Sequence, residues 1–241
     1  MNVLVIIQAR MGSTRLPGKV LMPLGDAVVL DYVVSRCRAM QLASGVVVAT
    51  TVLGQDDAIA TWCRQRSVPV FRGPEDDVLA RYAACAGEYG ADYVVRVTAD
   101  CPFVDYALAD RLIEAATGAR AEIARVDGEL ARGLLAEVVS AEALAKIDRL
   151  GREHRHREHV TYYAYEFPDL FQAVWVKAPE ALCRPQFRIT LDTAEDYAML
   201  SRVANAFYGD RLVAAETVVA FLERHPEVAA INAHVRQKPV V

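Results

Sequence analysis

The chain has 241 residues, of which 54% are hydrophobic, enough for one large buried core but short for two independent domains. Its formal charge of −4 provides no general field that would attract nucleic acid or an anionic membrane, so any anion site must be local. We therefore expect a single domain over residues 1–241, with neither nucleic acid nor membrane as a partner.

The cysteines and the first residues both favour a cytoplasmic protein. The five cysteines are scattered and never form a CxxC pair, which argues against a disulfide framework or a thiolate zinc site. The N-terminal segment lacks the basic start and cleavage site of a signal peptide, and no apolar run approaches the roughly 18 residues needed to span a bilayer. We expect a cytoplasmic protein with reduced thiols.

Short β-branched runs alternate with amphipathic segments in the first half of the chain. The first strands are apolar without alternation, as in central strands buried on both faces. This rhythm predicts an α/β fold with a mostly parallel central sheet and helices on both faces. The expected strands are at 3–8, 45–49, 68–71 and 93–97, and the expected helices at 29–39, 56–65, 75–89 and 105–116.

Beyond about residue 117 the pattern loosens, and we treat 118–180 as a less regular portion of the same domain. We expect strands near 121–126, 172–177 and 186–191, a helix from Ser140, and a polar helix over the Arg-Glu-His repeat at 152–159. The spacing of Thr193 and Asp196 is that of a capping box, so a helix should begin just after Asp192. Asp105 and the Asp56-Asp57 pair are expected to cap their helices.

The connection after the first strand carries the strongest functional signal. It holds three cations, two glycines and two hydroxyl side chains but no acid. Glycines let backbone amides approach a ligand, and the cations and hydroxyls suit a polyphosphate. The spacing fits neither GxxxxGK[ST] nor GxGxxG, and a merely solvated loop would not explain the clustering. We predict that the nucleotide-binding residues here are Gln8, Ala9, Arg10, Gly12, Ser13 and Thr14, and that Arg15 and Lys19 are catalytic.

Two carboxylates are expected near this loop. Asp100 follows the strand at 93–97, and Asp192 follows the expected strand at 186–191. Ligands of open α/β sheets bind outside the carboxyl ends of the strands, and Mg²⁺ prefers one or two carboxylates together with substrate phosphates. We therefore predict that Asp100 and Asp192 hold Mg²⁺ and that Asp100 is catalytic. For each residue alone, a turn carboxylate or a helix cap is the alternative.

The stretch IIQARMGSTRLPGKVL at 6–21 resembles the opening motif of the cytidylyltransferase family. That family includes the Kdo and acylneuraminate cytidylyltransferases and the spore coat polysaccharide biosynthesis protein F group, which this motif resembles most. The likeness covers almost the whole chain, because further segments align in order: VVVATT, FRGPEDDVLARY, RVTADCPFVD, REHVT and LDTAEDY.

The resemblance implies a Rossmann-like nucleotide-diphosphosugar transferase fold and a homodimer. It implies transfer of CMP from CTP to a sugar or sugar acid, with release of pyrophosphate, in surface polysaccharide or glycoconjugate biosynthesis. It also supports the same Mg²⁺ carboxylates.

The resemblance further suggests which segments choose the base and the acceptor. It places base or ribose recognition near 71–82, and we assign nucleotide contacts to Thr51 and Arg72. Glu137 and His159 are expected at the acceptor. Relatives usually carry Gly-Leu-Asp-x-Glu-Val where this chain has Leu135 in place of the Asp. This departure predicts a different acceptor, or loss of the contact that the Asp would make.

Three alternatives remain open at this stage. The histidines at 152–159 invite a zinc site, but the spacing matches no strong zinc motif and the neighbouring arginines would repel a cation, which favours a polar helix face or a dimer contact. A metal-dependent glycosyltransferase shares this kind of fold. A nucleotide-binding subunit without turnover is the third alternative.

Overall fold

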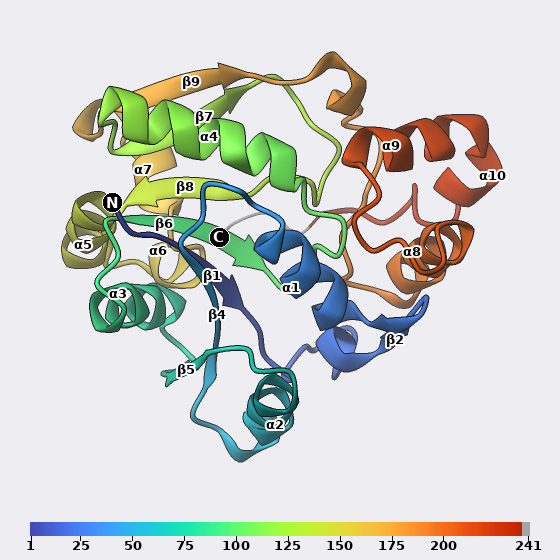
Figure 1. Cartoon of the computed structure of the whole chain (residues 1–241), viewed down its shortest axis with the longest axis horizontal. Coiled ribbons are helices and arrows are strands. Elements are labelled where there is room, and N and C mark those ends of the chain that lie inside the picture. The colour runs from blue at the N-terminus through green and yellow to red at the C-terminus, as the bar shows by residue number, and fades with distance from the viewer. Residues whose placement is uncertain (238–241) are drawn as a thin grey trace.

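A computed structural model describes residues 1–237; the last four residues of the expected domain lie outside the described part. One seven-stranded sheet, in the order β5-β4-β1-β6-β8-β7-β9, runs through the molecule (Figure 1). All neighbouring strands pair in parallel except β8, which is antiparallel to both β6 and β7. The strands are β1 (Val3–Gln8), β4 (Gly45–Thr51), β5 (Val70–Gly73), β6 (Tyr93–Thr98), β7 (Ile123–Asp127), β8 (Glu137–Ser140) and β9 (Ala173–Lys177). The predicted mostly parallel sheet is confirmed.

Helices cover both faces of the sheet because the central strands present apolar side chains to both sides. Along β1, Val3, Val5 and Ile7 belong to one buried cluster and Leu4 and Ile6 to the other. The first cluster includes residues of α1 (Val29–Arg38), α2 (Asp57–Gln65), α4 (Tyr106–Ala119), α8 (Ala194–Ala206) and α9 (Ala215–Arg224). The second includes residues of α3 (Val78–Glu88), α5 (Ala141–Leu150) and α7 (Tyr162–Glu166).

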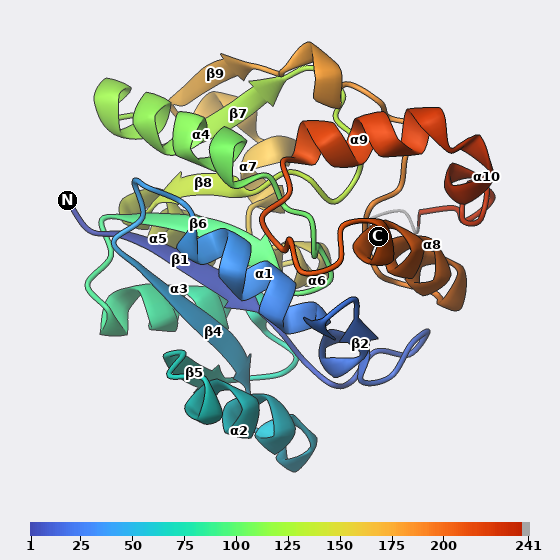
Figure 2. The same cartoon turned by 45° about the vertical axis from the view of Figure 1, so that its right-hand side comes forward.

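The C-terminal part packs beyond the carboxyl end of β6, where the Leu191 amide donates to the Asp100 carbonyl. The helix α8 packs beside the small β2–β3 hairpin (Pro23–Leu24 and Ala27–Val28), where the Tyr197 hydroxyl donates to the Pro23 carbonyl (Figure 2). A short helix, α10 (Pro226–Ala229), follows α9. In the part of the chain that the structure describes, no helix is both long enough and apolar enough to cross a membrane.

One expected strand is wrong. Residues 186–191 form only a single bridge, between Arg188 and Arg132. The segment is extended, but its amides reach loops rather than a neighbouring strand: Ile189 donates to the Arg132 carbonyl and Leu191 to the Asp100 carbonyl. It therefore lies across the end of the sheet and brings Asp192 there without joining it.

Two of the expected caps are confirmed and one is wrong. Asp105 accepts hydrogen bonds from the amides of residues 107 and 108, and Thr193 and Asp196 form a capping box. Ser140, where a helix is expected to begin, also caps that helix by accepting a hydrogen bond from the amide of residue 143. The Asp56 side chain makes no capping bond. Its carboxylate is fully buried and accepts hydrogen bonds from the Met11 amide, on the loop after β1, and from the Thr51 hydroxyl.

Candidate active site

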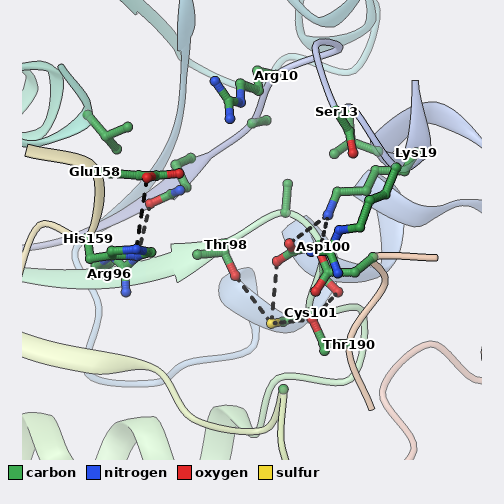
Figure 3. A pocket seen from close by; sticks show the side chains of 18 of the residues that line it. Arg10, Ser13, Lys19, Arg96, Thr98, Asp100, Cys101, Glu158, His159 and Thr190 are labelled. Atoms are coloured by element: carbon green, nitrogen blue, oxygen red, sulfur yellow. Dashed lines mark hydrogen bonds and ion pairs between the residues drawn. The ribbon is translucent and has the colours of Figure 1, made fainter. Parts of the chain in front are cut away.

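A cavity of about 600 Å³ opens at the carboxyl ends of β1 and β6 (Figure 3). One side is the basic loop, residues 9–19, and the floor is the segment that follows β6. At the opposite end lie Glu158 and His159, from the end of α6 (His154–Glu158). Of the predicted site residues, those that line this cavity are Gln8, Ala9, Arg10, Ser13, Thr14, Arg15, Lys19, Asp100, His159 and Asp192.

The basic loop is held in place through its backbone. The Ala9 amide donates to the Ala49 carbonyl at 3.2 Å, which extends the pairing of β1 with β4. The Met11 amide donates to the buried Asp56 carboxylate at 2.7 Å. At Gly18 the backbone has φ of 72°, a left-handed conformation that favours glycine. The loop's shape is therefore fixed by backbone contacts, which leaves its side chains free to meet a ligand.

Gly12 lies on the loop but faces away from the cavity lining, since a Cβ there would lie 2.9 Å from Gln55 Nε2 and 3.3 Å from Glu75 Oε1. The Arg10 guanidinium is only loosely paired, at 3.9 Å from Glu75, and its side chain is 44% exposed. A side chain at position 12 would therefore displace the ends of the Gln55 and Glu75 side chains. Arg10 is available to an incoming anion.

Lys19 is the centre of the site. Its buried ammonium donates to Asp100 Oδ2 at 2.8 Å, to the Leu191 carbonyl at 2.6 Å and to Asp192 Oδ1 at 2.9 Å, so all three donors have partners. Burial alone would lower the pKa of Lys19, but the two carboxylates outweigh it and the pKa is raised. The two acids that sequence placed 92 positions apart thus converge on one cation.

Asp192 lies among three cations. Its second oxygen accepts a hydrogen bond from Arg188 at 2.6 Å, and Arg15 approaches its first oxygen at 3.2 Å. Burial would raise the pKa of Asp192, yet Lys19, Arg15 and Arg188 together lower it. Arg188 is itself fixed by the buried Asp196 at 2.9 Å. The carboxylate is therefore ionised and rigidly aimed at the cavity.

Asp100 and Asp192, with the Leu191 carbonyl, form a set of oxygen ligands that already surrounds a positive charge. Among residues 1–237, no group of three or more histidine, cysteine or acidic side chains could hold a metal ion. A divalent ion here would depend on these two acids plus oxygens from substrate and water, which is the ligand set that Mg²⁺ usually adopts. The residues fit such an ion.

The thiol of Cys101 lies beside this pair, 3.2 Å from Thr98 Oγ1 and 3.7 Å from Thr190 Oγ1. Burial and the neighbouring Asp100 raise the pKa of Cys101 to about 12. Because the thiolate is the nucleophilic form, this side chain is a neutral part of the lining and not a nucleophile.

A buried ion pair, which the sequence did not predict, lies at the far end of the cavity. Arg96, on β6, pairs with Glu137 at the start of β8 and donates to Gln8 Oε1 at 3.3 Å. Glu137 also accepts a hydrogen bond from Thr161 at 2.8 Å and does not line the cavity. Its predicted contact with the acceptor stays a prediction; here it holds Arg96 in position.

His159 lines the cavity beside Glu158, 4.0 Å from its carboxylate. Burial lowers the pKa of His159, with the Glu158 charge opposing and Arg96 reinforcing the shift. The ring is therefore neutral near pH 7 and able to donate or accept a hydrogen bond. The other histidines do not converge with it, since His156 is buried against Glu166, and the zinc alternative finds no site among the described residues.

Thr51 and Arg72 lie behind the basic loop rather than on the cavity lining. Thr51 is fully buried and its hydroxyl donates to Asp56. Arg72 donates to the Thr51 and Leu53 carbonyls and pairs with Asp57 at 2.6 Å. Their predicted nucleotide contacts stay predictions, and in this arrangement both residues support the loop.

Sequence reasoning missed four charged residues that line the cavity: Arg81, Arg96, Arg132 and Glu158. Arg96 offered a signal, because a charged residue interrupts the otherwise apolar strand β6. Arg81 lies in helix α3 with its guanidinium buried against the Pro74 carbonyl, and no local pattern distinguishes it from a solvent-facing arginine.

The chain matches the family model described as cytidylyltransferase over residues 4–224. It is 36% identical to the spore coat polysaccharide biosynthesis protein SpsF of Bacillus subtilis over 234 residues, covering 95% of this chain and 97% of that protein. It is 33% identical to the 3-deoxy-manno-octulosonate cytidylyltransferase of Anaeromyxobacter dehalogenans over 193 residues, 72% of this chain and 78% of the relative. The structure of a cytidylyltransferase from Leptospira borgpetersenii superposes with a TM-score of 0.88 at 30% identity, over 99% of both chains.

Proposed function

Because the chain belongs to the cytidylyltransferase family, we propose that it transfers CMP from CTP to a sugar or sugar acid and releases pyrophosphate. The product would serve surface polysaccharide or glycoconjugate biosynthesis, as the name of the Bacillus relative indicates for that protein. The observation that carries the proposal is the convergence of Asp100 and Asp192 on Lys19, at the open side of a loop rich in cations and hydroxyls.

The reaction joins an acceptor oxygen to the α-phosphorus of CTP. The acceptor hydroxyl loses its proton as its oxygen forms the new P–O bond, and the bond from the α-phosphorus to pyrophosphate breaks with its electron pair on the leaving group. Such transfers depend on positioning and charge neutralisation more than on a protein nucleophile. Arg10, Ser13 and Thr14 would hold the triphosphate, and Arg15 and Lys19 would neutralise the charge that develops on pyrophosphate.

Asp100 and Asp192 would hold a divalent cation, which we propose to be Mg²⁺. When bound, such an ion neutralises phosphate charge and lowers the pKa of a coordinated hydroxyl. These acids already share the Lys19 ammonium, so the position between them favours a cation. Lys19 would then be free to neutralise the charge of phosphates bound by the loop from which it projects.

We also propose that the protein is a homodimer and that it is cytoplasmic. Sedimentation velocity of the purified protein tests the homodimer, and fractionation of the source cells tests the location.

The proposal is tested by incubating the protein with each of four nucleoside triphosphates, Mg²⁺ and a panel of sugars and sugar acids, while measuring pyrophosphate. Release of pyrophosphate with CTP and one acceptor is the expected result. Asp100→Asn should remain folded and lose turnover, whereas Asp169→Asn, an exposed acid away from the cavity, should match the wild type.

Two other results would contradict the proposal. Release of a nucleoside diphosphate from a sugar nucleotide, without pyrophosphate formation from any triphosphate, would indicate a glycosyltransferase. A thermal shift with CTP and Mg²⁺ but no turnover with any acceptor would indicate a binding subunit. Near-normal pyrophosphate release by Asp100→Asn would remove Asp100 from the catalytic group.

A further inference from the structure

The chain after α10 returns to the active-site cavity. Helix α10 packs beside α8 (Figure 2), and Gln237, further along the chain, lines the cavity together with Asp192. This segment lies beyond residues 4–224, which match the family model. We propose that Gln237 is a positioning residue that acts through Arg188 on Asp192, and that residues 232–237, the C-terminal arm, form one wall of the substrate site. The inference rests on the proposed function and adds a residue to it.

Asn232 anchors the start of the C-terminal arm. It is 2% exposed, and its amide nitrogen donates to the Arg188 carbonyl at 2.9 Å and to Asp196 Oδ1 at 2.8 Å. Both protons of the amide group thus have partners. The Val235 amide donates to the Asn232 carbonyl at 3.0 Å, which turns the chain after the anchor. The arm is therefore tied to the same two residues that hold Asp192.

The Arg188 guanidinium is held from three directions. Its Nε donates to Asp196 Oδ1 at 2.9 Å, its Nη2 donates to Asp192 Oδ2 at 2.6 Å, and its Nη1 donates to Gln237 Oε1 at 2.8 Å. Among residues 1–237, Gln237 is the single partner of Nη1. Because a guanidinium is planar and its donors point in fixed directions, the contact at Nη1 limits how far the group can swing away from Asp192.

The position of Arg188 matters because the two oxygens of Asp192 have different partners. Oδ1 accepts a hydrogen bond from Lys19 at 2.9 Å, whereas Oδ2 is held by Arg188. If the guanidinium moves, Oδ2 follows it and the carboxylate rotates, so Oδ1 leaves the place where cation and phosphate should meet. A misplacement of about 1 Å can lower a rate about a hundredfold. Gln237 can therefore affect turnover without bonding to Asp192.

A neutral amide suits position 237 better than a carboxylate. Arg188 already carries one positive charge between two acids, Asp192 and Asp196. A third acid would compete with Asp192 for that charge, whereas glutamine accepts the hydrogen bond from Nη1 without adding a charge. Gln237 is exposed and lines the cavity, while Arg188 is buried and does not line it. The amide nitrogen of Gln237, which has two donors, is therefore available to a substrate oxygen.

Steady-state kinetics of pyrophosphate release separate positioning from binding. Gln237→Met keeps a side chain of similar length but offers Nη1 only a weak acceptor. It should lower kcat about tenfold and leave the KM for CTP within about twofold. Gln237→Glu should lower kcat about a hundredfold, because the new acid competes for Arg188. Both substitutions are at an exposed residue, so Tm should stay within about 2 °C of the wild type.

Arg236→Gln is the matched control. It changes the neighbouring exposed residue, which does not line the cavity, and it should have wild-type kcat and KM. Wild-type kcat in both Gln237 variants would overturn the proposal. So would a loss confined to the KM for CTP, which would indicate contact with the nucleotide without control of Asp192, and so would an equal loss of kcat in Arg236→Gln.

Trypsin provides a test on the wild-type protein, because one of its cleavage sites lies in the arm. Arg236 is exposed and is followed by Gln237, whereas Lys238 is followed by Pro239 and resists the protease. Cleavage after Arg236 removes residues 237–241, which mass spectrometry of the intact chain detects. Pyrophosphate release by the wild type should fall in proportion to this cut, and Arg236→Gln, which lacks the site, should keep its activity under the same treatment. Full activity after the cut would overturn the proposal.

The rate of this cut also separates the inference from the proposed reaction. A ligand beside Gln237 should stabilise the arm in place, so CTP with Mg²⁺ at about ten times its Kd should slow the cut about tenfold. Slowing of the cut without pyrophosphate release from any triphosphate would refute the proposed reaction and support the arm as a wall of the site. Pyrophosphate release together with an unchanged rate of cutting and wild-type kcat in the Gln237 variants would support the reaction and refute the inference.

Discussion

Asp56 and Asp57 are adjacent carboxylates, and we predict opposite consequences when each is removed. Asp56 is fully buried and accepts hydrogen bonds from the Met11 amide and the Thr51 hydroxyl. Hydrogen bonds to a charged group contribute about 1.5–3 kcal/mol each. After allowance for relief of carboxylate burial, Asp56→Ala should lower the free energy of unfolding by roughly 2–4 kcal/mol, about 5–15 °C in Tm for a chain of this length.

Asp57 provides the matched control. Its side chain is 64% exposed and pairs with Arg72 on the surface, where an ion pair contributes about 0–1 kcal/mol. Asp57→Ala should therefore shift Tm by no more than about 4 °C. Thermal unfolding followed by circular dichroism measures both variants.

The loop also links Asp56 to function. In Asp56→Ala the basic loop loses the hydrogen bond that the Met11 amide donates to Asp56. The KM for CTP should therefore rise about tenfold or more in Asp56→Ala and stay unchanged in Asp57→Ala. If the two variants have the same Tm and the same KM for CTP, Asp56 does not anchor the loop and our account of its shape fails.

Three further predictions concern the cavity. Lys19→Met should lower kcat about a hundredfold to a thousandfold. Because Asp100 and Asp192 lose their shared cation in this variant, Mg²⁺ alone should raise its Tm more than it raises the Tm of the wild type. An equal rise in Tm for both proteins would count against this reasoning. Cys101→Ser should keep wild-type turnover at pH 7.5. Cys101 and Cys183 are both partly exposed, but burial of the thiol raises the pKa of Cys101 to about 12, so iodoacetamide should modify Cys183 first, as followed by peptide mass mapping; rapid modification of Cys101 would contradict this. Burial lowers the pKa of His159 in the folded protein, so the unfolded chain binds more protons and stability is lost as pH falls below about 6.5. In thermal melts, His159→Gln should lose less stability than the wild type over that pH range. Identical pH profiles of Tm for the two proteins would refute the lowered pKa of His159.

The sequence predicts most of the first half of the chain and the loop that lines the cavity, because the signals there are local. The apolar run of β1 is explained by two cores on opposite faces, and the motif at 6–21 identifies both the family and the loop that lines the cavity. The expectation that Asp100 and Asp192 meet follows from strand-end geometry. It succeeds although residues 186–191 are not a strand, because two loops hold that segment in an extended form at the same edge.

The rest of the site depends on side chains that meet only in the folded chain. Asp56 has the sequence context of a helix cap, and only the path of the basic loop turns it into an anchor. The four-residue strand β8 is too short to show a period, so neither its reversed direction nor the Arg96–Glu137 pair across it was predicted. The contact between Gln237 and Arg188 likewise joins segments that carry no shared motif.

The bond between Lys19 and Asp192 spans 173 positions of the chain, and this affects how the protein is made. At ordinary rates of synthesis, roughly 10 to 35 seconds separate the emergence of the two residues from the ribosome. A partly synthesised chain therefore carries the basic loop without one of its two acidic partners. The site is completed only when the last quarter of the polypeptide has folded, so truncated translation products should be inert.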